Sequence, residues 1–227
     1  MENLKVIFED NHIIVVEKKP NIPSQSDKTG DIDMLTIVKQ YIKEKYNKPG
    51  NVYLGLVHRL DRPVGGVMIF AKTSKAASRL SNQVREKIFK KKYLAVVDGY
   101  FKEKEGTLED YLYKDERNNI SRVVNRDKKN SKLAKLDYKE LVYNEVKDLS
   151  LLEINLHTGR HHQIRVQLAN AGHSIFGDQK YGKRGQGKQI ALWAFELTIE
   201  HPITKEELTF KDFPESIGTW CILKELK

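Results

Sequence analysis

The chain has a single cysteine, Cys221, which excludes an internal disulfide and a metal site built from a cysteine cluster. No apolar run approaches the roughly 20 residues that cross a membrane. The start, Met1-Glu2-Asn3, lacks the basic and apolar regions of a signal peptide. Internal repeats and linkers rich in Pro, Gly or Ser are also absent. These absences predict a cytoplasmic protein that does not enter a membrane.

Charge of one sign dominates the rest of the composition. The 227 residues include 40 Lys and Arg against 31 Asp and Glu, and the pI is near 9.3. Because each phosphate contact by Lys or Arg releases counterions, this balance favours a polyanionic partner. Basicity alone does not identify that partner as RNA.

Short apolar segments with period-two alternation outnumber those with helical spacing, and several follow one another directly. Strands are predicted at 5–9, 12–17, 67–72, 93–97, 108–112, 134–138, 141–143, 151–156, 191–199 and 208–210, and helices at 33–46, 74–87 and 163–171. The order predicts an α+β fold with a largely antiparallel mixed β-sheet flanked by helices and loops. We expect one domain over 1–227, with a core of about 6–214, and a monomer.

Local signals refine these segments. Asp31 or Asp33 is placed to cap the first helix, and Ser74 to cap the second. The second helix is expected to bury Ala77, Leu80 and Val84. The polar segment 114–132 is predicted to be a loop, and 182–188 a flexible basic loop suited to a phosphate backbone.

The segment His58–Gly66 combines an aspartate, three basic side chains and two glycines immediately before an apolar strand. Pro63 fixes its own φ and disfavours a helical Arg62, so Asp61 is expected on a constrained loop. Gly65 and Gly66 allow backbone conformations or close approaches that a side chain would forbid. An active-site edge and a surface turn with an Arg–Asp ion pair are both consistent with this pattern.

A second long motif runs from Leu156 to Gly182, through Thr158-Gly159-Arg160-His161-His162-Gln163-Ile164-Arg165 and Gly177-Asp178. Together with HRLDRPVGGVMIFAK at 58–72, it resembles the signatures of the RluA-type family of RNA pseudouridine synthases. Two long motifs in the family's order are far more specific than either alone. The resemblance implies a pseudouridine synthase-like catalytic domain that acts on rRNA or tRNA without a cofactor or a metal.

The resemblance also implies roles for individual residues. Asp61 matches the family's catalytic aspartate, Arg165 the arginine that pairs with it, and Tyr93 a tyrosine that stacks on the uracil. A buried carboxylate needs such an arginine to stay ionised. Substrate binding is predicted for His58, Arg59, Arg62, Arg160 and His161, with Arg59 implicated in flipping the base out of its stack.

Some features depart from the family pattern. Val64-Gly65 replaces the usual Thr-Ser, and Trp193 stands where relatives commonly have a histidine. The chain is also expected to be a stand-alone catalytic domain without the N-terminal S4-like RNA-binding domain of many relatives. These departures predict altered substrate handling rather than loss of catalysis.

Other classes of protein remain possible from the residues. A metal-dependent hydrolase could use His157, His161, His162 and His173, although Thr158-Gly159 interrupts the helix that would align the first two and no acidic cluster accompanies them. The same basic surface could belong to a non-catalytic RNA-binding module. An N-glycosidase would use Asp61 but release free uracil.

Overall fold

The computed structural model describes residues 4–183, 187 and 189–226. The chain divides into two compact units. Unit 1 comprises residues 1–90 and 194–213, and unit 2 comprises residues 91–193 and 214–227. None of the helices in the described part of the chain combines the length and apolarity that a membrane crossing requires.

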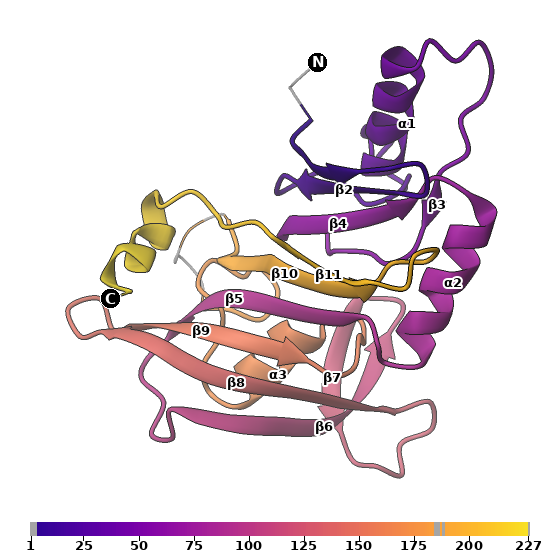
Figure 1. Ribbon diagram of the computed structural model, residues 1–227. Coiled ribbons are helices and arrows are strands. Elements are labelled where there is room, and N and C mark those ends of the chain that lie inside the picture. Colours follow the sequence, from indigo (N-terminus) through magenta and orange to yellow (C-terminus); the bar gives the residue numbers. More distant parts are fainter. Residues whose placement is uncertain (1–3, 184–186, 188, 227) are drawn as a thin grey trace. The chain divides into compact units, whose positions relative to one another are not determined.

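Unit 1 is built on antiparallel strands (Figure 1). Its strands are β1 (Val6–Glu9), β2 (Ile13–Lys18), β3 (Gly55–Leu56), β4 (Gly65–Ala71), most of β10 (Leu192–Glu200) and β11 (Glu207–Lys211), and its helices are α1 (Met34–Lys45) and α2 (Ser74–Arg85). β2 pairs with β1 and with β4, β4 neighbours β10, and β11 pairs with β10. Their apolar side chains form one core, to which α2 contributes Ala76 and Leu80.

The two helices of unit 1 follow from local sequence. In α1 the carboxylate of Asp33 accepts a hydrogen bond of 3.0 Å from the backbone N–H of Thr36, which confirms Asp33 as the cap. The cap of α2 is Thr73 rather than Ser74, because the Thr73 hydroxyl accepts from the N–H of Ala76. The buried residues of α2 are Ala76, Leu80 and Gln83, so the prediction is confirmed for Leu80, whereas Ala77 is only partly buried and Val84 is exposed.

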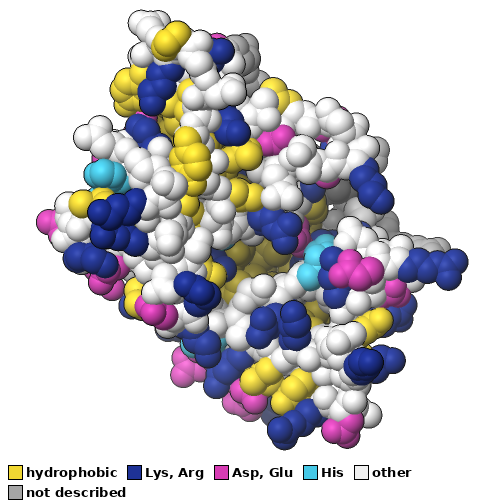
Figure 2. Space-filling view, turned by 90° about the vertical axis from the view of Figure 1, so that its right-hand side faces the viewer, with side chains coloured by type: hydrophobic (Ala, Val, Ile, Leu, Met, Phe, Trp, Pro, Cys, Tyr) yellow, Lys and Arg dark blue, Asp and Glu magenta, His cyan; other side chains and the backbone are white. Residues whose placement is uncertain are grey.

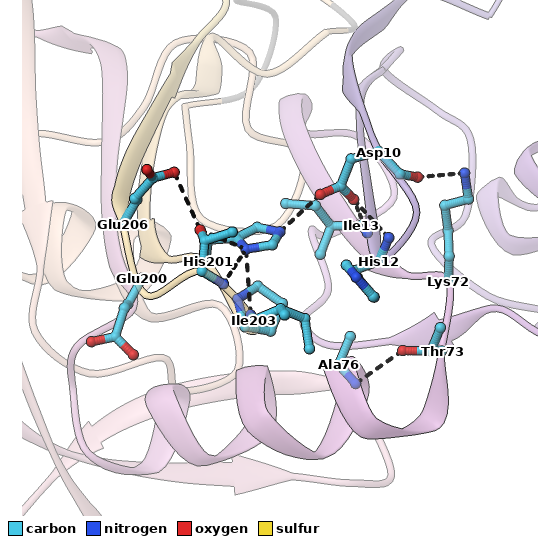
Figure 3. A network of polar contacts seen from close by, with 12 residues as sticks. Asp10, His12, Ile13, Lys72, Thr73, Ala76, Glu200, His201, Ile203 and Glu206 are labelled. Atoms are coloured by element: carbon cyan, nitrogen blue, oxygen red, sulfur yellow. Dashed lines mark hydrogen bonds and ion pairs between the residues drawn. The ribbon is translucent and has the colours of Figure 1, made fainter.

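A buried histidine joins the two sequence segments of unit 1 (Figure 3). His201 Nε2 lies 2.8 Å from Asp10 Oδ2, and His201 Nδ1 accepts from the backbone N–H groups of Ile203 and Thr204. The Thr204 hydroxyl is 3.0 Å from the same Nδ1, so an Asp–His–hydroxyl series is present. Two backbone N–H groups already donate to His201 Nδ1. We therefore interpret these contacts as structural, because they hold the turn that follows β10.

Unit 2 contains a long antiparallel sheet in the order β5-β9-β8-β6-β7 (Figure 1). Its strands are β5 (Lys90–Asp98), β6 (Glu105–Asp115), β7 (Ile120–Val124), β8 (Lys132–Asn144) and β9 (Leu149–Leu156), followed by α3 (Gln163–Asn170) and a C-terminal 3₁₀ helix, Gly218–Glu225. The prediction of a loop over 114–132 was wrong in part, because β7 forms a hairpin with β6 inside it. The predicted basic loop 182–188 lies mainly outside the described residues.

Helix α3 is buried around most of its circumference, although it carries polar residues. Gln163, Arg165 and Gln167 are each at most 3% exposed. Gln167 Nε2 donates to Asp110 Oδ2 at 2.7 Å and to the carbonyl of Leu108 at 3.2 Å, which fixes the helix to β6. The helix ends at Asn170, Ala171 is its C-cap, and Gly172 follows with φ +90°, as is common for the residue after a helix.

Candidate active site

The segment that carries Asp61 is a tight loop between β3 and β4 in unit 1. Leu60 is buried, whereas Arg59 is exposed and Asp61 is half-buried. The N–H of Val64 donates to the carbonyl of Asp61 at 3.0 Å and closes the turn. The loop therefore buries the apolar side chains of Leu60 and Val64, while Arg59 is exposed and Asp61 is half-buried.

Gly66 explains why the loop can enter β4 at this point. Its φ is +124°, and a Cβ there would lie 2.2 Å from the carbonyl oxygen of Ala194 on β10. Only glycine fits such an approach between neighbouring strands. The prediction that this glycine pair serves a close backbone approach is confirmed for Gly66.

Two of the predicted substrate-binding residues on this loop already have protein partners. His58 Nε2 accepts a hydrogen bond of 3.2 Å from the backbone N–H of Ile69, and its ring packs 5.2 Å from that of Phe89. Arg62 forms an ion pair with Asp31 and a 3.0 Å hydrogen bond with the Thr29 hydroxyl. The hydrogen bond that the Arg62 guanidinium donates to Asp31 lowers the pKa of this exposed carboxyl.

The other predicted residues lie in unit 2. Tyr93 is on β5 opposite Ile154 of β9 and is 7% exposed. Arg165 is in α3, with Arg160 and His161 just before the helix. The structure thus brings Arg160, His161 and Arg165 together at one helix, and His58, Arg59, Asp61 and Arg62 on one loop of unit 1.

Asp178 is the partner of Arg165 that sequence reasoning missed. Its carboxylate accepts from Nε at 2.7 Å and from Nη2 at 2.6 Å, in a bidentate pair whose side chains are 0% and 4% exposed. The backbone N–H of Lys180 also donates to Asp178 at 2.9 Å. A guanidinium has five N–H donors, so this pair orients the group without using all of them. The only sequence signal was the place of Asp178 within the second motif.

His162 fixes the start of α3 in a different way. It adopts a left-handed conformation, with φ 53°, and its Nδ1 lies 2.9 Å from the Tyr181 hydroxyl. The same hydroxyl oxygen accepts a hydrogen bond from the N–H of Ser121. Burial, followed by the charge of Arg165, lowers the pKa of His162 to about 2.

The remaining histidines of the second motif have separate partners. His157 Nε2 lies 2.5 Å from Asp137, His161 Nδ1 lies 3.0 Å from the Ser121 hydroxyl, and His173 Nδ1 lies 3.0 Å from the carbonyl oxygen of Asp98. Over residues 4–183, 187 and 189–226, the structure places no three His, Cys, Asp or Glu side chains where they could hold a metal.

Comparison with known proteins defines the class of this site. A model of the RNA pseudouridylate synthase family matches residues 12–170, which include Asp61, Tyr93 and Arg165. The uncharacterized RNA pseudouridine synthase YhcT of Bacillus subtilis is 33% identical over 225 residues, covering 96% of this chain and 71% of that protein. Ribosomal large subunit pseudouridine synthase C of Buchnera aphidicola is 35% identical over 179 residues, covering 79% and 54%.

A solved structure shows the same fold. Human RNA Pseudouridylate Synthase Domain Containing 1 matches with a TM-score of 0.77 at 24% identity, over 96% of this chain and 86% of that chain. The chain belongs to the RNA pseudouridylate synthase family. Within that family it is an RluA-type RNA pseudouridine synthase, an isomerase.

Proposed function

We propose that the protein converts specific uridines of structured RNA to pseudouridine, with Asp61 as the catalytic carboxylate. The reaction breaks the C1′–N1 bond, turns the uracil and joins its C5 to C1′; the hydrogen on C5 leaves as a proton and N1 gains a proton. A carboxylate near C1′ assists as a nucleophile or as a base on the sugar, dividing one difficult step into easier ones.

The observation that carries this proposal is the position of Asp61. It lies in the family-matched segment, on a loop closed by the Val64–Asp61 hydrogen bond, with Leu60 anchored in the core. A reacting group on a fixed backbone loses little freedom when the substrate binds, which favours catalysis.

We assign supporting roles to Arg165 and Tyr93. Asp178 holds the Arg165 guanidinium in one orientation, which suits a fixed positive charge in an active site. Tyr93 supplies an aromatic ring and a hydroxyl, which fit stacking on a base and the late proton transfer at C5.

RNA binding is supported by charge. The net charge is +9, and Figure 2 shows Lys and Arg side chains spread over the face that it views, with Asp and Glu among them. Arg59 is exposed beside Asp61, and we assign it to the flipping of the target base. His58, Arg62, Arg160 and His161 complete the proposed substrate-binding set. Because two relatives are named as ribosomal large subunit synthases, ribosomal RNA is the first substrate to test and tRNA the second.

Tritium release from RNA labelled at uridine C5 tests the proposal. We expect the wild-type protein to release tritium without free uracil, and Asp61→Asn to release none. Asp148→Asn is the matched control, since Asp148 is exposed in unit 2 and has a left-handed backbone that asparagine tolerates. Equal release by wild type and Asp61→Asn would remove Asp61 from the mechanism, free uracil would indicate an N-glycosidase, and tight binding without release would indicate a non-catalytic RNA-binding module.

A further inference from the structure

Lys18, the last residue of β2, is a fully buried lysine that the proposed reaction does not use. Its side chain is 0% exposed, although lysine is almost never fully buried without a partner. Burial lowers its pKa to about 7, and the negative charge of Asp61 opposes this effect. Keeping a cation in this position disfavours folding unless its contacts compensate.

The contacts of Lys18 lead to the loop that carries Asp61. Its Nζ lies 2.6 Å from the carbonyl oxygen of Val64, 2.9 Å from that of Arg62 and 3.3 Å from that of Lys19. Three acceptors match the three N–H donors of an ammonium group. The two shortest bonds are made to residues just after Asp61.

Ser24 binds the same loop on the other side of Asp61. Its hydroxyl donates to the carbonyl of Leu60 at 2.8 Å and accepts from the N–H of Leu60 at 3.1 Å. Between Lys18 and Ser24, the backbone N–H of Asn21 donates to the carbonyl of Arg62 at 2.8 Å. One short segment, residues 18–24, therefore fixes the peptide groups on both sides of Asp61.

We propose that Lys18 and Ser24 are positioning residues for Asp61, which hold the backbone of residues 60–64 and so direct the carboxylate. This inference rests on the proposed function, in which Asp61 is the reacting group. A displacement of a reacting group by about 1 Å costs on the order of 10²-fold in rate. The Lys18 ammonium group binds three separate carbonyls, so its loss should lower the reaction rate more than loss of the Ser24 hydroxyl.

The substitutions Lys18→Met and Ser24→Ala test this role. Methionine keeps the length of the lysine side chain and removes its donors and charge, and alanine removes only the hydroxyl. Lys19→Met is the matched control, because it makes the same chemical change at the next residue, whose side chain is exposed. Each variant is measured for tritium release under single-turnover conditions over a range of RNA concentrations, and for its melting temperature.

We expect the rate at saturating RNA to fall about 10²-fold in Lys18→Met and about 5- to 10-fold in Ser24→Ala. The RNA concentration for half-maximal rate should change little. The melting temperature of Lys18→Met should be below that of wild type, because buried carbonyl oxygens lose the donor that Lys18 supplies. A role in stability alone would not lower the rate of folded enzyme.

Folded Lys18→Met and Ser24→Ala with saturating rates within about twofold of wild type would overturn the inference. A rate that falls only with the folded fraction would do the same, and if Lys18→Met does not fold, Ser24→Ala decides. Wild type and Asp61→Asn are run in parallel. If wild type is inactive, or if Asp61→Asn is fully active, the proposed function itself is refuted. If wild type is active, Asp61→Asn is inactive and the Lys18 and Ser24 variants are unaffected, only this inference is refuted.

Discussion

Replacing Asp178 by asparagine should destabilise unit 2 strongly. The substitution keeps the shape of the side chain but removes the negative charge opposite the Arg165 guanidinium, to which it is bound at 2.7 and 2.6 Å. Both side chains are almost inaccessible to water. Removing one partner of such a buried ion pair costs about 3–5 kcal/mol.

This loss is large compared with a typical free energy of unfolding of about 5–15 kcal/mol. For a chain of this size, each kcal/mol changes the melting temperature by about 2–4 °C, so Asp178→Asn should melt about 6–20 °C below wild type. Urea unfolding followed by circular dichroism gives the free energy directly, and Asp148→Asn, at an exposed site, controls for the chemical change.

A double-mutant cycle identifies the origin of the loss. Arg165→Met alone removes the cation, and the combination Arg165→Met with Asp178→Asn removes both charges. The double variant should be less destabilised than the sum of the single variants. A cost below about 1 kcal/mol for Asp178→Asn, the range of exposed ion pairs, would refute the reasoning.

Two further changes test other parts of the structure. The pKa of His162 is lowered from 6.5 to about 2 in the folded protein. Below pH 6.5 the unfolded state therefore binds a proton that the folded state does not, and the free energy of unfolding decreases as the pH decreases. Between pH 8 and pH 5 the free energy of unfolding of wild type should decrease by about 2 kcal/mol more than that of His162→Asn. Asparagine is chosen because it suits the left-handed backbone. Urea titrations at both pH values measure the two decreases, and equal decreases would contradict the prediction. Gly66→Ala should cost at least about 3 kcal/mol, because its Cβ would overlap the backbone of Ala194. Gly50→Ala, where no atom lies within 4 Å of the added Cβ, should be close to neutral in the same melting experiment.

Most strands and helices could be predicted because their apolar periodicity agrees with their burial. The errors arose where that signal was weak. β7 was missed because its residues Ile120–Val124 lie in a charged segment, and only pairing with β6 makes them a strand. The cap of α2 was misplaced because Thr73 and Ser74 are adjacent hydroxyl residues that both suit the position.

The candidate site residues were proposed from their motifs, whereas Asp178, Ser24 and Lys18, which contact those residues or their backbone, were not identified from the sequence. Asp178 and Ser24 are far in sequence from the groups that they bind, and only the fold brings them close. Lys18 could not be identified because burial of a lysine contradicts the usual preference of that residue for water.

The discontinuity of unit 1 affects how the chain is made. β10 and β11 supply Leu197, Ile199 and Phe210 to its core, and about a hundred residues of unit 2 are synthesised before them. At about 5–20 residues per second, that interval lasts about 5–20 s on the ribosome. During this time the edge of β4 that later pairs with β10 has no neighbouring strand, and the apolar face of the first strands is exposed to solvent unless another protein binds it. The Asp10–His201 hydrogen bond is thus among the last contacts of unit 1 that the nascent chain can make.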